Sequence, residues 1–187
     1  MMKRLFIGIP MVSEVAANQA AIWKNDRPLN TNRINWSRYE NWHITLFFLG
    51  NTSVDRIAVL RKLIDESFRT VSGFCAGLKG VGVFPDQRDP KVLWLGLEGL
   101  ESLMPAYEQL GQLLRDHGFE YDRKPLKPHL TIARVKHLEH RNSLESVLSE
   151  FQDFDFGSVA VDRLVLYESV STSHGPVYQP VFEKQLG

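Results

Sequence analysis

Short apolar runs and amphipathic stretches alternate along the chain. Seven apolar runs have the length and side-chain types of β-strands and lie at residues 5–9, 43–49, 74–79, 92–97, 129–135, 159–167 and 177–182. Between them, apolar residues recur at helical spacing in four stretches, at residues 13–23, 54–68, 103–114 and 143–151. Polar segments rich in Gly, Pro or charged residues separate these elements at 25–39, 80–90 and 119–127, and we expect loops there. The pattern predicts a globular protein of mixed helices and strands.

Local signals at the helix ends agree with this assignment. Ser13 is a suitable N-cap for the first helix, and Thr52-Ser53-Val54-Asp55 has the form of a capping box before the second. Gly118 follows the third helix, where a left-handed residue would end it.

The two halves of the chain repeat this order of elements. A shift of 86 residues places His43 on His129 and Thr45 on Thr131, and it also places the opening strand on the strand that begins near Val92. Each half then has a strand, a helix, a His-x-Thr strand, a helix and a strand, roughly at 4–80 and 91–168, although residue identities barely match. We therefore expect residues 1–187 to form a single domain of two similar lobes related by a pseudo-twofold axis, with a central cleft between them.

The composition argues against a protein that binds nucleic acid over a broad surface, is stabilised by disulfides or spans a membrane. Lys plus Arg and Asp plus Glu balance at 22 each, so a broad nucleic-acid footprint is not expected, although a site for one or two phosphates remains compatible. The single cysteine, Cys75, cannot form an internal disulfide, and no apolar run approaches the roughly 20 residues that span a bilayer. We expect a cytoplasmic protein with no membrane association, and nothing in the sequence requires a second subunit, so a monomer is expected.

The paired His-x-Thr motif carries the chemical information. Residues i and i+2 of a strand share a face, so each copy presents one imidazole and one hydroxyl on the same side. Histidine titrates near neutrality, so one imidazole can act as a base while the other acts as an acid. The hydroxyls of Thr45 and Thr131 could donate to phosphate oxygens. A single copy would be a weak signal, but two copies at equivalent points of two halves predict a site for phosphate ester chemistry.

Metal and cofactor sites are not expected. Zinc requires three or four ligands, and no third His, Cys or carboxylate lies at a suitable spacing from His43 and His129. The two imidazoles already supply both proton transfers, so no cofactor is needed for the chemistry.

At these motifs the sequence resembles the two-histidine phosphoesterase superfamily, and in particular its bacterial branch of RNA 2′,3′-cyclic phosphodiesterases, historically called 2′-5′ RNA ligases. The resemblance runs nearly end to end, through the opening strand 4–9, the first motif 42–50, the mid-chain strand 92–96, the second motif 128–134 and the closing hairpin 166–178.

The resemblance implies a bilobal α+β fold in which two antiparallel sheets with flanking helices face a central active-site cleft. It implies that RNA 2′,3′-cyclic phosphate ends are opened to 2′-phosphomonoesters, with His43 as the acid on the 3′ oxygen and His129 as the base on water. Run in reverse, the same pair could join RNA ends through a 2′-5′ linkage. The partner would be the RNA cyclic phosphate end or a nucleotide.

Two further residues are expected to bind substrate. Strict alternation places Phe47 on the face of His43, where members of the family often have a basic residue and where Phe47 could stack on a base. Arg134 would help to hold the phosphate, but alternation turns it away from His129, so it reaches the cleft only if the strand twists or bulges.

Two other hypotheses remain open at this point. The same residues would serve a phosphodiesterase acting on 2′-5′ oligonucleotides or on a cyclic phosphate of an ADP-ribose derivative. A non-catalytic protein that binds RNA ends could also use this cleft.

Overall fold

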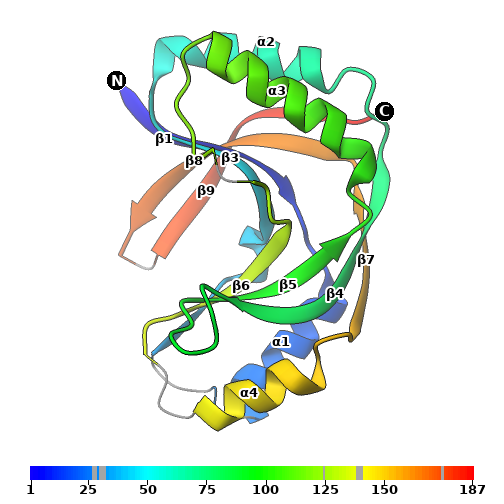
Figure 1. Ribbon diagram of the computed structural model, residues 1–187. Helices are drawn as coiled ribbons and strands as arrows, with labels where there is room; N and C mark the ends of the chain where they lie inside the picture. The colour runs from blue at the N-terminus through cyan, green and yellow to red at the C-terminus, as the bar shows by residue number, and fades with distance from the viewer. Residues whose placement is uncertain (27–28, 30–32, 124, 138–140, 174) are drawn as a thin grey trace.

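The computed structural model describes residues 1–26, 29, 33–123, 125–137, 141–173 and 175–187. Within them the chain forms strands and helices in an α+β arrangement (Figure 1). The strands are β1 (Met2–Pro10), β2 (Ile34–Trp36), β3 (His43–Ser53), β4 (Phe74–Phe84), β5 (Val92–Glu98), β6 (His129–Val135), β7 (Asp155–Val161), β8 (Arg163–Thr172) and β9 (Gly175–Gln185). The helices are α1 (Glu14–Asp26), α2 (Ile57–Ser67), α3 (Met104–Asp116) and α4 (Arg141–Glu150), and short 3-10 turns precede β3, α2 and α3.

The strands form two antiparallel sheets. The first has the order β3-β1-β8-β9 and the second the order β2-β6-β5-β4-β7. The helices α2 and α3 pack together at one end of the molecule, and α1 and α4 lie together at the other (Figure 1). Because α2 contacts β9 while α1 contacts β7 and α4 contacts β4, each sheet has its own helical layer. The expected α+β fold of two antiparallel sheets with flanking helices is confirmed.

The two sheets are equivalent under the 86-residue shift, but neither is built from one half of the chain. The shift relates β3, β1 and β8 of the first sheet to β6, β5 and β4 of the second, in the same spatial order. The first half therefore gives β4, and also the short β2, to the second sheet, and the second half gives β8 and β9 to the first. Helices α1 and α3 are exchanged in the same way, since α1 contacts β7 and α3 packs on α2.

Several predicted boundaries change in the structure. Strand β2 lies in a segment expected to be a loop, β4 continues five residues beyond Lys79, and the expected strand 159–167 is divided between β7 and β8, which belong to different sheets. Strand β4 continues because the register shifts at Gly80, whose φ of +71° favours glycine. The predicted N-cap is confirmed, since the Ser13 hydroxyl accepts a hydrogen bond from the Ala16 N–H at 3.3 Å.

The core lies between each sheet and its helices. Between the first sheet and its helices, the Phe47 ring of β3 stacks on Tyr107 of α3 at a centroid distance of 4.7 Å. Between the second sheet and its helices, Trp23 of α1 packs edge-on against Phe151 and Phe156. The helices thus cover the outer faces of the sheets. In the described part of the chain, no helix is long and apolar enough to cross a membrane.

Candidate active site

The two His-x-Thr strands meet at the centre of the molecule. Strands β3 and β6 belong to different sheets and contact each other, with β6 visible near the middle of Figure 1. Their side chains line one open cleft of about 1100 Å³. The cleft wall includes His43 and Thr45 from β3 and His129 and Thr131 from β6. The structure therefore brings together the four residues of the paired motif.

The two imidazoles are held in the same way. The Nδ1 atom of His43 lies 2.7 Å from the Asn41 carbonyl oxygen, and the Nδ1 atom of His129 lies 2.7 Å from the Lys127 carbonyl oxygen. A carbonyl oxygen can only accept, so each Nδ1 carries a hydrogen and donates it. In the neutral imidazole, Nε2 is then the unprotonated nitrogen and is left for a ligand.

Aromatic side chains pack against each imidazole, but the two environments differ. The His43 ring lies 4.8 Å from Phe6 and 5.0 Å from Tyr178, measured between ring centroids. The His129 ring meets Phe84 at a right angle, with centroids 4.9 Å apart. Glycine is needed beside His43, because a Cβ at Gly8 would lie 2.7 Å from the Ile44 carbonyl oxygen and 3.4 Å from the His43 ring.

Electrostatics also separates the two histidines. Burial lowers the pKa of His43 below its ordinary value of 6.5, and the positive charges of Arg134 and His129 lower it further. The hydrogen bond to the Asn41 carbonyl acts in the opposite direction and is outweighed. In the free protein His43 is therefore neutral at pH 7, and a bound phosphate would favour its charged form.

A β-bulge in each motif strand decides which residues face the cleft. Thr45 pairs with Gly8 and Phe47 with Ile7, so Leu46 is an extra residue in β3. Thr131 pairs with Trp94 and Ala133 with Leu93, so Ile132 is an extra residue in β6. The shift of 86 residues also relates these two bulges. After each bulge the alternation of faces is reversed.

The predicted position of Phe47 is wrong for this reason. Phe47 is 2% exposed and packs against Tyr107 and Tyr121 on the helical side of the sheet. Its neighbour Phe48 is 40% exposed and lines the cleft in its place, with the Arg4 guanidinium 4.9 Å from its ring centroid. Strict alternation missed Phe48 because the bulge could not be seen in the sequence.

Arg134 lies in the cleft, because β6 has the bulge that was needed to turn this side chain toward His129. Both neighbours in the chain, Ala133 and Val135, are buried, whereas Arg134 is exposed and lines the cleft with His129 and Thr131. In the described residues it has no carboxylate at ion-pair distance. Its position is equivalent to that of Phe48, so one motif presents a cation where the other presents an aromatic ring.

The hydroxyls of Thr45 and Thr131 are available to bind a ligand. Thr45 and Thr131 are partly buried cleft residues, and their hydroxyls have no hydrogen-bond partner among the residues that the structure describes. Two imidazoles, two hydroxyls and one guanidinium around a single space suit an anion with several oxygens. Within the same residues, no group of three or more His, Cys, Asp and Glu is arranged to hold a metal ion.

Other cleft residues were not singled out from the sequence. Besides Arg134, the cations of the cleft are Arg4, Lys24, Arg38 and Lys136. Their signal in the sequence is weak, because they lie in β1, in α1 and in the segments that follow β2 and β6, and the tertiary fold alone brings them together.

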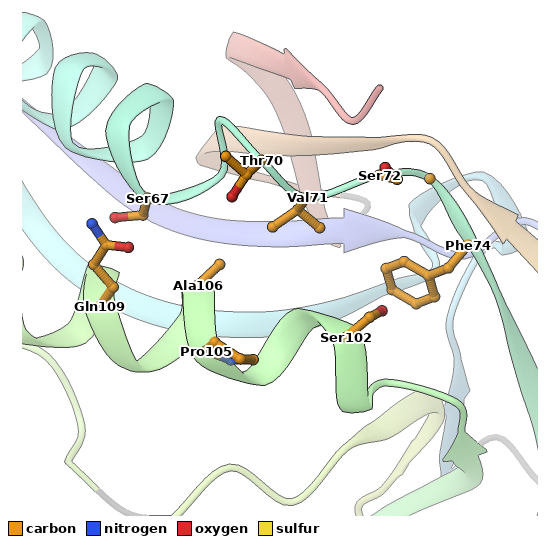
Figure 2. A pocket seen from close by; sticks show the side chains of 10 residues that line it. Ser67, Thr70, Val71, Ser72, Phe74, Ser102, Pro105, Ala106 and Gln109 are labelled. Carbon is orange, nitrogen blue, oxygen red and sulfur yellow. The ribbon is translucent and has the colours of Figure 1, made fainter.

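A second hollow, of about 470 Å³, lies between the end of α2 and the start of α3. Figure 2 shows Ser67, Thr70 and Val71 on one side and Pro105, Ala106 and Gln109 of α3 on the other. The residues that line it carry no charge, so it does not suit a phosphate.

Known proteins with similar sequences and structures agree on one family. A protein from Thermotoga maritima named RNA 2′,3′-cyclic phosphodiesterase is 37% identical over 151 residues, which are 81% of this chain and 79% of that protein. One of the same name from Methanocaldococcus jannaschii is 29% identical over 180 residues, covering 96% of this chain and 99% of the relative. The crystal structure of E. coli LigT complexed with 3′-AMP superposes with a TM-score of 0.77 at 25% identity, covering 100% of this chain and 99% of LigT.

The family model described as the 2′-5′ RNA ligase superfamily matches residues 21–172, which include both His-x-Thr motifs and most of the strands that carry the cleft. This chain belongs to the 2′-5′ RNA ligase superfamily.

Proposed function

We propose that this protein is a metal-independent RNA 2′,3′-cyclic phosphodiesterase that opens cyclic phosphate ends to 2′-phosphomonoesters. Support comes from relatives of that name at up to 37% identity over most of the chain. Further support comes from the chemistry of the cleft, which combines two proton carriers with several donors for phosphate oxygens.

One observation carries the proposal. Both imidazoles donate Nδ1–H to a backbone carbonyl at 2.7 Å, and both line the same cleft. This leaves two Nε2 atoms for one substrate, one on each side of the pseudo-twofold axis. A cyclic phosphodiester needs such a pair, because its attacking water and its leaving oxygen lie on opposite sides of phosphorus.

The reaction follows from this arrangement. Nε2 of His129 takes a proton from water as the water oxygen bonds to phosphorus, and the bond from phosphorus to O3′ breaks. Nε2 of His43 gives its proton to O3′, which leaves a 3′-hydroxyl and a 2′-phosphate. The lowered pKa of His43 makes its imidazolium a stronger acid. The negative phosphate stabilises this imidazolium, so that His43 takes up a proton from solvent when the substrate binds. Afterwards His129 releases its extra proton to solvent and His43 takes one up from solvent, which restores both imidazoles.

The remaining residues hold the substrate. The hydroxyls of Thr45 and Thr131 and the guanidinium of Arg134 donate to the non-bridging oxygens, where negative charge grows in the transition state. Phe48 is the stacking surface for a base, in place of Phe47. In the reverse direction, a 5′-hydroxyl in place of water would give a 2′-5′ linkage.

One chain supplies every residue of this site, so the proposal includes a monomer of 21.4 kDa, which light scattering after size-exclusion chromatography would measure. It also includes a cytoplasmic location, since the lone Cys75 is an exposed free thiol.

The test uses an RNA oligonucleotide with a 2′,3′-cyclic phosphate end, incubated with the protein in EDTA. We expect a 2′-phosphate product, distinguished from a 3′-phosphate by ³¹P NMR. His43→Ala and His129→Ala should each lower kcat by about 10²–10⁴-fold, the usual contribution of one acid or base. His117→Ala is the matched control, because His117 is exposed at the end of α3 and its Nδ1 also bonds a backbone carbonyl.

A substrate panel separates this proposal from its competitors. Faster turnover of 2′-5′ oligonucleotides or of an ADP-ribose cyclic phosphate would assign a different substrate to the same residues. Tight RNA binding without product, a requirement for a divalent metal, or near-normal rates in both histidine variants would overturn the proposal.

A further inference from the structure

The cleft is far more positive than the protein as a whole. The chain has equal numbers of basic and acidic residues, yet five Lys or Arg residues and no Asp or Glu are found among the described residues that line the cleft. These cations are Arg4, Lys24, Arg38, Arg134 and Lys136. A single cyclic phosphate carries one negative charge, so this surplus exceeds what the reacting group needs.

The five cations of the cleft differ in the partners that they already have. Of the five cations, Arg134 is the one whose charge lowers the pKa of His43. Arg38 lies 3.8 Å from Glu40, and Arg4 lies over the Phe48 ring, so both have partners of their own. Lys24 and Lys136 have no carboxylate at ion-pair distance in the described part of the chain.

Lys136 continues the line of donors along β6. Val135 between Arg134 and Lys136 is buried, whereas both basic residues are exposed and line the cleft, so they share the cleft face. The Lys136 N–H donates to the Arg33 carbonyl at 2.8 Å, which continues the pairing of β2 with β6 and fixes the backbone there. Two residues of strand rise by about 6.6 Å, which is comparable to the separation of adjacent phosphates in an extended RNA strand.

We infer that Lys136, together with Lys24 at the end of α1, forms a second phosphate subsite for the internucleotide phosphate next to the cyclic end. The inference rests on the proposed function and deepens it. Arg134 contacts the reacting phosphate, and Lys136 and Lys24 contact the phosphate that joins the last nucleotide to the one before it. The enzyme therefore selects the ends of RNA chains over cyclic mononucleotides.

The test compares two substrates that differ by one phosphate, adenosine 2′,3′-cyclic phosphate and the same nucleotide with an added 5′-phosphate. The wild-type protein should show kcat/KM about tenfold higher for the second, the usual value of a charge-assisted contact. Lys136→Gln and Lys24→Gln should each remove most of this preference and leave kcat/KM for the first substrate unchanged. Lys62→Gln, at an exposed position on α2 outside the cleft, is the matched control and should change neither value.

Salt supplies a second readout. For an oligonucleotide that ends in a 2′-phosphate, the slope of log Kd against log salt should become shallower by about 0.7 in Lys136→Gln, the loss of one phosphate contact on a single strand. This measurement does not require turnover. If the wild-type protein hydrolyses neither these nucleotides nor the RNA oligonucleotide with a cyclic phosphate end, the proposed function fails, and the binding slope still tests the subsite. Equal wild-type rates for the two nucleotides, an equal loss for both in the variants, or an unchanged salt slope would overturn the subsite.

Discussion

His43 and His129 are equivalent by sequence position and by backbone contact, and their surroundings distinguish them. Each donates Nδ1–H to the carbonyl of the residue two positions earlier. His43 is packed by Phe6 and Tyr178, and its burial lowers its pKa, with the charge of Arg134 acting in the same direction. The two histidines therefore differ in packing and nearby charge rather than in the motif itself, and the proposed division into acid and base rests on that difference.

A histidine titration followed by NMR tests this difference. In the free protein the Cε1–H signal of His43, assigned with His43→Ala, should titrate with a midpoint below 6.5. Arg134→Gln should raise the midpoint, because removal of a nearby positive charge favours the imidazolium. Inorganic phosphate should raise it in the wild-type protein. A midpoint at or above 6.5 in the free protein would contradict the assignment of His43 as a buried, neutral imidazole.

At the scale of elements, the bulges in β3 and β6 determine the content of the site. The motif residues up to Thr45 and Thr131 obey simple alternation and could be predicted from the sequence. Beyond them the extra residues Leu46 and Ile132 reverse the faces, which puts Phe48 and Arg134 in the cleft. A bulge is defined by pairing with a neighbouring strand, so local periodicity cannot reveal it.

Other elements show the same limit of sequence patterns. The four helices could be predicted because apolar residues recur in them at helical spacing, and the two motif strands because they are short apolar runs. Strand β2 was missed because it has three residues in a polar segment, and its pairing with β6 stabilises it. The boundary at Asp162 between β7 and β8 was missed because both strands are apolar, and sheet assignment depends on tertiary pairing.

The adjacent residues Phe47 and Phe48 provide a paired test of the β3 bulge. Phe47→Ala should destabilise the protein by about 3–5 kcal/mol, because it leaves a cavity beneath α3. Phe48→Ala should change stability by less than about 1 kcal/mol, since it loses little more than an exposed contact with Arg4. It should instead lower kcat/KM about tenfold through lost base stacking. Urea denaturation and steady-state kinetics measure both, and the reverse pattern would contradict the bulged register.

At the scale of the whole molecule, the exchanged elements lead us to expect that the two halves of the chain unfold as one cooperative unit. Each sheet takes two strands from the other half of the chain, since the first includes β8 and β9 and the second includes β2 and β4. Neither half of the chain contains all the strands of one sheet. Neither half contains all the helices that cover one sheet, because α1 of the first half contacts β7 and α3 of the second half packs on α2. The cleft that holds the paired motif therefore depends on strands from both halves.

Division of the chain in the loop between β4 and β5 tests this interdependence. Fragments 1–86 and 87–187 should each lack stable tertiary structure, because β1 loses β8 and β4 loses β5, which leaves long unpaired edges. Mixed together, they should recover the dispersed NMR spectrum and the cyclic phosphodiesterase activity. The intact chain should unfold in one transition, with far-UV circular dichroism and tryptophan fluorescence coincident in urea. A fragment 1–86 that folds alone, or two separate transitions, would mean that each half is an autonomous lobe and that the strand exchange contributes little to stability.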